Sequence, residues 1–260
     1  MKKRTKIFLC IIAVVLVTAV LYFTVLHPRV KVGIQVLRIY SDWGFVDIGD
    51  PCQPFTAYDV TDDSLVTKDC VPYYIGIPED MLEIDEHEDL PDIKYVGRGE
   101  QGEQRTVFSV NIGYDESERV ILNEEVAEDA VLYSKLCKAY DKLGYGIPDN
   151  RYATWKCSLL LDKSDYNFLN YHKSLAFAYA LEERCWNTSF RIDEPGEMTY
   201  YYETDDKCAL IHERFNSTDG TYEYLVELLD TDDLNTYYPI VIYTPDPAEA
   251  YAIINSVEFK

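Results

Sequence analysis

Residues 198–244 read MTYYYETDDKCALIHERFNSTDGTYEYLVELLDTDDLNTYYPIVIYT, and this stretch decides the fold. It contains four runs rich in β-branched and aromatic residues, at 198–203, 208–215, 222–229 and 238–243. Short polar segments that suit turns separate the runs. Strands that follow one another through short turns usually pair antiparallel, so the stretch predicts an antiparallel sheet.

Helices and further strands are expected on both sides of this stretch. Asn123 can cap a helix that ends at Gly144, and a second helix is expected from Asp165 to about Trp186. A third is expected at 247–254. Further strands are expected at 32–39, 73–77, 93–96, 106–114, 152–161 and 257–259. The prediction is an α+β fold, an antiparallel sheet with about three packed helices.

The N-terminus has the pattern of a membrane anchor. Four basic residues (Lys2, Lys3, Arg4 and Lys6) precede an apolar run at 7–26 in which only two threonines are polar. Twenty helical residues span about 30 Å, the thickness of the hydrocarbon core of a bilayer. The run ends in bulky residues, whereas a cleaved signal peptide, the alternative, needs small ones. We expect a cytoplasmic tail at 1–6, a signal anchor at 7–26, a strand- and loop-rich juxtamembrane segment at 29–70 and the main domain at 71–260.

The charge distribution orients this anchor. The basic residues before the span keep the N-terminus in the cytoplasm, which predicts a single-pass protein of the cell membrane with an extracytoplasmic C-terminal domain. The first 28 residues hold four of the 24 basic residues and none of the 46 acidic ones, so residues 29–260 carry a formal charge of −26. Such a domain attracts basic partners and repels phosphate backbones, so we expect no nucleic-acid partner.

The cysteine count suits an oxidising compartment. Cys10 lies in the apolar run, which leaves an even number in the outer domain. The disulfide candidates are Cys52, Cys70, Cys137, Cys157, Cys185 and Cys208, with Cys52–Cys70 the preferred pair. The alternative is that several of these cysteines are small buried apolar residues.

Clustered carboxylates are the most conspicuous candidate binding feature. An acidic patch without any Lys or Arg comprises Glu79, Asp80, Glu83, Asp85, Glu86, Glu88, Asp89 and Asp92. Thr-Asp-Asp recurs at 61–63, 204–206 and 231–233. Clustered oxygens can bind Ca²⁺, and the candidate ligands are Asp230, Asp232, Asp233 and Asn235. Asp also initiates turns, and we favour that interpretation, with no resident cofactor.

Motifs of known catalytic chemistry are incomplete. Residues 97–102 match G-x-G-x-x-G, but a strand-like run follows where dinucleotide binding needs a helix, which predicts a hairpin turn. His212 and Glu213 begin a zinc-protease motif whose second histidine is replaced by Asn216. His172 could approach Cys137 or Cys157 as a nucleophile pair, although a buried core histidine is the commoner outcome.

Two short stretches resemble a known family. YYIGIPEDM at 73–81 and PDPAEAYAIINSVEF at 245–259 resemble the opening strand and the closing helix and strand of Mog1/PsbP-like domains. Together they cover about 24 of the 260 residues. The resemblance implies an antiparallel sheet between helices and a binding or accessory role.

Three functions remain open from the sequence. The favoured hypothesis is a membrane-anchored, non-catalytic domain that binds a protein or envelope partner, a basic one if the acidic patch is the contact. A second is a cell-envelope hydrolase that acts on glycan through a carboxylate pair, whose separation a sequence does not reveal. A third is a purely structural tethered domain.

Overall fold

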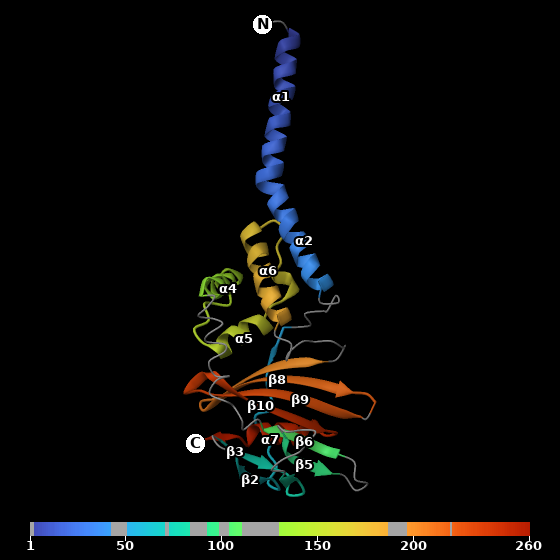
Figure 1. Ribbon diagram of the computed structural model, residues 1–260, viewed down its shortest axis with the longest axis vertical. Helices are drawn as coiled ribbons and strands as arrows, with labels where there is room; N and C mark the ends of the chain where they lie inside the picture. Colours follow the sequence, from blue (N-terminus) through green and yellow to red (C-terminus); the bar gives the residue numbers. More distant parts are fainter. Residues whose placement is uncertain are drawn as a thin grey trace.

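The computed structural model describes residues 3–42, 51–70, 73–83, 93–98, 104–110, 130–186, 197–218 and 220–260. Within these residues the chain has a mixed α+β fold, as the sequence predicts. Figure 1 shows a long N-terminal helix, a layer of shorter helices below it, a broad sheet, and a small sheet with a further helix on the opposite side of the broad one.

The main sheet has eight strands among the described residues, and only β1 and β7 pair in parallel. In pairing order the strands are β1 (Gln53–Pro54), β7 (Met198–Glu203), β8 (Lys207–Asn216), β9 (Thr221–Asp230), β10 (Asp233–Thr244), β6 (Gln104–Val110), β5 (Ile93–Arg98) and β4 (Leu82–Glu83). The four runs of 198–244 therefore form consecutive antiparallel strands, as predicted. Strands β5 and β6 pair as the predicted hairpin.

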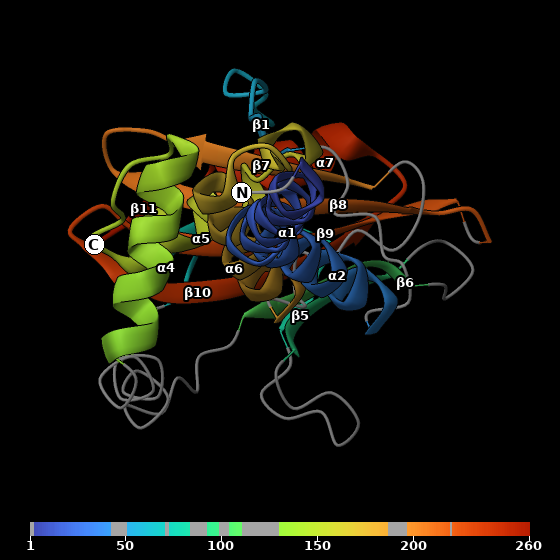
Figure 2. The same cartoon turned by 90° about the horizontal axis from the view of Figure 1, so that it is seen from above.

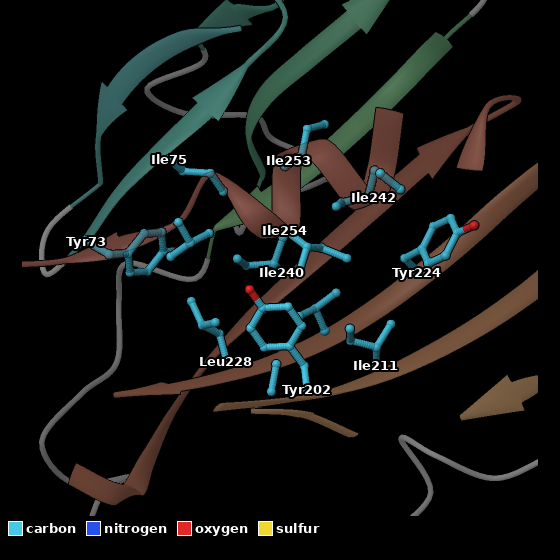
Figure 3. Packing of buried hydrophobic residues seen from close by; sticks show 14 of the residues in the cluster. Tyr73, Ile75, Tyr202, Ile211, Tyr224, Leu228, Ile240, Ile242, Ile253 and Ile254 are labelled. Carbon is cyan, nitrogen blue, oxygen red and sulfur yellow. The ribbon is translucent and has the colours of Figure 1, made fainter. Parts of the chain in front are cut away.

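One face of this sheet carries the largest core. Ile211 pairs with Val226, and Val226 pairs with Ile240, so strand alternation places all three on the same face. All three are at most 1% exposed. Helix α7 (Pro247–Asn255) covers this face together with the small sheet of β11 (Glu258–Phe259), β3 (Tyr73–Ile77) and β2 (Val66–Asp69) (Figure 3). The predicted closing helix and the strand at 73–77 are thus confirmed.

The other face of the sheet meets the helical layer. Leu210 and Leu229 pack there against Tyr152 and Leu159 of α5 (Arg151–Leu159). Seen from above, the helices lie over the sheet (Figure 2). The layer also contains α4 (Ala130–Leu143), the short 3₁₀ turn η2 (Lys163–Asp165) and α6 (Tyr171–Trp186). As predicted, Gly144 stops α4: the helix ends at Leu143, and the φ of 104° at Gly144 suits glycine. The expected start at Asn123 lies outside the described residues.

The N-terminal helix continues much further than expected. Elements α1 (Lys3–Leu21), η1 (Tyr22–Leu26) and α2 (His27–Asp42) follow one another without a break, so the strand predicted at 32–39 is wrong. Val32, Val36 and Ile39 repeat at the helical spacing of four and three and are buried against α6, whereas Ile34 and Leu37 are exposed. The partial alternation of apolar residues at 32–39 therefore reflects one buried face of a helix.

Two other expectations in the helical layer are also corrected. The run at 152–161, predicted as a strand, is α5, because Asn150 caps it by accepting a hydrogen bond from the Ala153 backbone N–H at 2.8 Å. The second helix begins at Tyr171 and not at Asp165, which instead completes a capping box on η2 with Asp162. The structure describes this helix as far as Trp186, and the residues after the predicted end lie outside the described residues.

Candidate functional site

An acidic hollow lies on the opposite side of the main sheet from the N-terminal helix. Its volume is about 410 Å³, and its lining residues are Asp62, Ser64, Pro78, Glu79, Asp80 and Glu249. The residues come from the loop before β2, the turn after β3 and the first turn of α7, three elements that Figure 1 shows together beneath the sheet.

Local backbone chemistry builds each wall of the hollow. Pro78 follows β3, and the Met81 N–H donates to the Pro78 carbonyl at 3.1 Å, which closes a turn with Glu79 and Asp80 at its exposed centre. Met81 is 6% exposed and anchors that turn in the core. In the loop before β2, Asp62 Oδ1 accepts a hydrogen bond from the Ser64 backbone N–H at 2.8 Å.

The third wall is the start of α7. Asp246 caps this helix by accepting a hydrogen bond from the Ala248 N–H at 3.0 Å, and Pro247 occupies its first turn. Glu249 accepts a hydrogen bond from the Thr244 hydroxyl at 2.5 Å, which fixes its carboxylate beside the end of β10. A carboxylate in the first helical turn is also favoured by the helix dipole.

The hollow is an anionic surface. Four of its six lining residues carry carboxylates, and no Lys or Arg is among them. Hydrogen bonds from the Ser64 side chain and backbone lower the pKa of Asp62, so that carboxylate stays ionised at neutral pH. Such a surface attracts positively charged groups of a partner.

The structure divides the predicted acidic patch. Glu79, Asp80 and Glu83 are described and exposed, and the first two line the hollow. Asp85, Glu86, Glu88, Asp89 and Asp92 lie outside the described residues. Sequence reasoning did not join Asp62 and Glu249 to the patch, because the pairing of β2 with β3 brings Asp62 near it and the packing of α7 against β3 brings Glu249.

The candidate Ca²⁺ ligands serve a turn between β9 and β10. Asp230 Oδ1 accepts a hydrogen bond from the Asp232 N–H at 2.9 Å, and Asp233 Oδ1 accepts one from the Asn235 N–H at 3.1 Å. Asn235 Oδ1 accepts one from the Arg151 N–H at 3.1 Å, which joins this turn to α5. In the part of the chain that the structure describes, no three His, Cys, Asp or Glu side chains group as a metal site.

The expected Cys52–Cys70 disulfide is wrong. Neither residue forms a disulfide, and the two are buried in different clusters: Cys70 lies in the core beneath the sheet and Cys52 lies between α5 and the sheet. Cys137, Cys157 and Cys208 are likewise buried thiols; of the Cys185 side chain nothing is described. The described cysteines therefore act as small core residues.

The proposed cysteine–histidine pair is also corrected. His172 is exposed, contrary to the core histidine that its apolar neighbours predict. The Cys137 and Cys157 thiols donate to the carbonyls of Pro148 and Tyr145, at 3.8 and 3.9 Å. Burial raises the pKa of both thiols, that of Cys157 to about 11, which disfavours the nucleophilic thiolate at neutral pH.

A second group of charged side chains, which sequence reasoning missed, lies on the face of the sheet that meets the helices. Arg214 Nε donates to Glu197 Oε1 at 2.7 Å, and the Tyr243 hydroxyl donates to Glu223 at 2.6 Å. His212 is 1% exposed and contacts the Thr199 hydroxyl through Nδ1 at 3.3 Å. His212 thus lies in a buried strand, which excludes the metalloprotease helix that His212 and Glu213 suggest.

Comparison of the chain with protein-family models, curated proteins and solved structures finds no match. The resemblance of 73–81 and 245–259 to Mog1/PsbP-like domains therefore stays a prediction. The acidic hollow, built from side chains of three separate elements, is the feature from which a function can be argued.

Proposed function

We propose that this chain is a single-pass membrane protein whose outer domain binds a basic protein or envelope partner through the acidic hollow. The observation that carries the proposal is the lining of the hollow, where four of the six described residues, from three segments, carry carboxylates. The proposal is for binding and not catalysis.

The N-terminal helix supports the anchoring half of the proposal. It is long and apolar enough to cross a membrane, and between Ile12 and Leu26 its large apolar side chains are exposed. Apolar side chains on a lone helix are costly in water and favourable in hydrocarbon. The four leading basic residues favour a cytoplasmic N-terminus, which would leave the domain outside the cell.

The continuity of the N-terminal helix with the domain supports the second half of the proposal, which concerns binding. Residues 27–42 extend α1 directly into the helical layer, where α2 packs against α6. A domain held in this way follows directly on the span, without a flexible linker between them. Elements β3 and α7, next to which the hollow lies, are on the other side of the main sheet from α1 (Figure 1), so the hollow would face away from the lipid and toward soluble or envelope partners.

A binding experiment with a defined cationic probe tests the proposal. The full chain is placed in nanodiscs, and the anisotropy of a fluorescent oligolysine peptide is followed at low and physiological salt. Asp62→Asn, Glu79→Gln, Asp80→Asn and Glu249→Gln together should weaken binding by at least tenfold, because they remove four charges and keep the shapes. The matched control neutralises four exposed carboxylates elsewhere, Asp141→Asn, Asp149→Asn, Glu182→Gln and Asp205→Asn.

Equal weakening in the two quadruple variants would contradict the proposal, because it would mean that net charge alone attracts the peptide. The alternatives predict other results. A structural tether predicts no saturable site in either variant. A glycan hydrolase predicts turnover of a polysaccharide that one carboxylate substitution abolishes. None of the described residues that line the hollow is an aromatic residue that could stack on a sugar, so we favour binding.

A further inference from the structure

A tight apolar turn lies beside the end of the proposed membrane span. The segment before α6 turns at Asn167, whose carbonyl accepts a hydrogen bond from the Asn170 N–H at 2.9 Å. Asn167 Oδ1 also accepts from the Leu169 N–H at 3.1 Å. These bonds hold Phe168 and Leu169 at the tip of the turn, which we call the 167–170 turn.

The N-terminal helix fixes the position of this turn. Arg29 Nε and Nη2 donate to the Leu169 carbonyl oxygen at 3.4 and 3.3 Å. Val25, Pro28 and Arg29 line a hollow of about 560 Å³ together with Leu169 and residues 170–172. Figure 1 shows the same arrangement, with one end of α6 next to the point where α1 passes into α2.

The level of the turn follows from helix geometry. The proposed span ends at Leu26, and Arg29 lies three residues further, about 4.5 Å along the axis at 1.5 Å per residue. The Leu169 carbonyl is therefore held where hydrocarbon gives way to lipid headgroups. Tyr22 and Phe23, one turn before Leu26, are exposed aromatic residues of the kind enriched at that boundary.

The two central side chains of the turn, Phe168 and Leu169, are apolar and exposed, between two exposed asparagines. Leu169 is 82% exposed, the largest fraction of any large apolar side chain among the described residues, and Phe168 is 40% exposed. Adjacent exposed apolar side chains of this kind can mark a site of contact with a membrane or another protein.

The charges around the turn match lipid headgroups. All 46 acidic residues lie beyond residue 41, and segment 166–173 contains none of them. The same region carries Arg29, Lys31 and Lys173, the last two exposed. In a domain that is otherwise strongly acidic, the surface next to the span is locally basic, which favours anionic lipids.

We propose that Phe168 and Leu169 insert into the interface of the bilayer that α1 crosses, as a second contact of the domain with the membrane. This inference rests on the proposed span. A helix alone leaves the domain free to tilt and rotate, whereas a helix and a second contact fix both. The second contact thereby keeps the acidic hollow directed away from the membrane.

Depth-dependent quenching in vesicles tests the insertion. Full-length Leu169→Trp protein is reconstituted in phosphatidylcholine–phosphatidylglycerol vesicles, with and without lipid that carries a nitroxide near the headgroup. We expect the emission added by Leu169→Trp, relative to wild type, to be blue-shifted and quenched. Phe168→Trp provides an independent second probe. The matched control is Phe215→Trp, 47% exposed at the end of β8, whose added emission should be unquenched.

Carbonate extraction of the same vesicles separates the two proposals. One outcome is that the protein resists extraction while the Leu169→Trp emission stays as unquenched as that of Phe215→Trp. That result would overturn the insertion and leave the proposed span intact. Protein that carbonate extracts would overturn the span, and the insertion with it.

Discussion

Arg29, three residues after the proposed membrane span, donates two hydrogen bonds to the carbonyl oxygen of Leu169, 140 positions later in the chain. This contact joins the N-terminal helix to the 167–170 turn before α6. The burial of Val32, Val36 and Ile39 against α6 extends the contact along α2. The helix that we propose as the membrane anchor is therefore also part of the fold of the domain.

Removing the Arg29 side chain should loosen this junction. We expect Arg29→Ala to cost about 1 kcal/mol of stability, the usual net contribution of hydrogen bonds at a partly exposed site. Hydrogen exchange at 167–172 should become faster. Lys31→Ala, which removes an exposed cation two residues after Arg29, is the control and should leave exchange unchanged. Equal exchange rates in wild type and Arg29→Ala would show that the contact contributes nothing.

The helical assignment of 32–39 predicts that alanine substitutions at neighbouring positions change the stability of the domain by very different amounts. Val36→Ala should destabilise the domain by about 1 to 3 kcal/mol, because it removes buried apolar surface between α2 and α6. Ile34→Ala, at a side chain that is 60% exposed, should change stability by less than about 0.5 kcal/mol. Thermal unfolding in detergent measures both, and equal effects would argue against this helical face.

The buried thiols should be reduced and slow to react. Native protein treated with a maleimide at pH 7 should leave Cys52, Cys70, Cys137, Cys157 and Cys208 unmodified, and denaturant without any reductant should expose all five. Intact mass before and after denaturation counts the thiols. A requirement for reductant at Cys52 or Cys70 would restore the disulfide.

The same groups predict a loss of stability at alkaline pH. Burial raises the pKa of Cys52 to about 12 and that of Cys208 to about 11, from an ordinary value of 9.0. Burial also raises the pKa of Tyr202 to about 12. The folded state therefore holds these protons after the unfolded state releases them, so stability is complete below pH 9 and falls as the pH rises toward 11 to 12. Unfolding midpoints between pH 7 and pH 11 measure this, and a flat profile would contradict it.

The β9–β10 turn predicts no dependence on calcium. Asp233 accepts hydrogen bonds from the Asn235 N–H and the Thr236 hydroxyl, so Asp233→Ala should destabilise the domain by about 1 to 2 kcal/mol. Addition of Ca²⁺ or of a chelator should leave the melting temperature of wild type and variant unchanged. A melting temperature that rises with Ca²⁺ in wild type and not in Asp233→Ala would assign a metal to this turn.

The sheet was readable from the sequence because its signals are local. Alternating apolar residues and short turns mark β7 to β10, and Asp246 with Pro247 marks the start of α7. The errors at 32–39 and 152–161 share one cause. Short apolar runs fit a strand or a buried helix equally well, and only the contacts of Val36 with α6 and the Asn150 cap decide between them.

The candidate site was readable only in part. Glu79 and Asp80 stand out in the sequence because they begin a run of acidic residues. Asp62 lies 17 residues before Glu79, and Glu249 lies 169 residues after Asp80. Their meeting depends on the pairing of β2 with β3 and on the packing of α7 beside β3. Tertiary packing of this kind leaves no local signal.

The most direct test of an outward-facing acidic hollow is labelling of one new thiol on intact cells that express the full chain. Ser64 lines the hollow, and the five native cysteines whose side chains are described are buried, so Ser64→Cys introduces an accessible thiol at the proposed site. We predict that a membrane-impermeant maleimide labels Ser64→Cys on intact cells and leaves wild type unlabelled. Labelling of Ser64→Cys only after the cells are permeabilised would contradict the account.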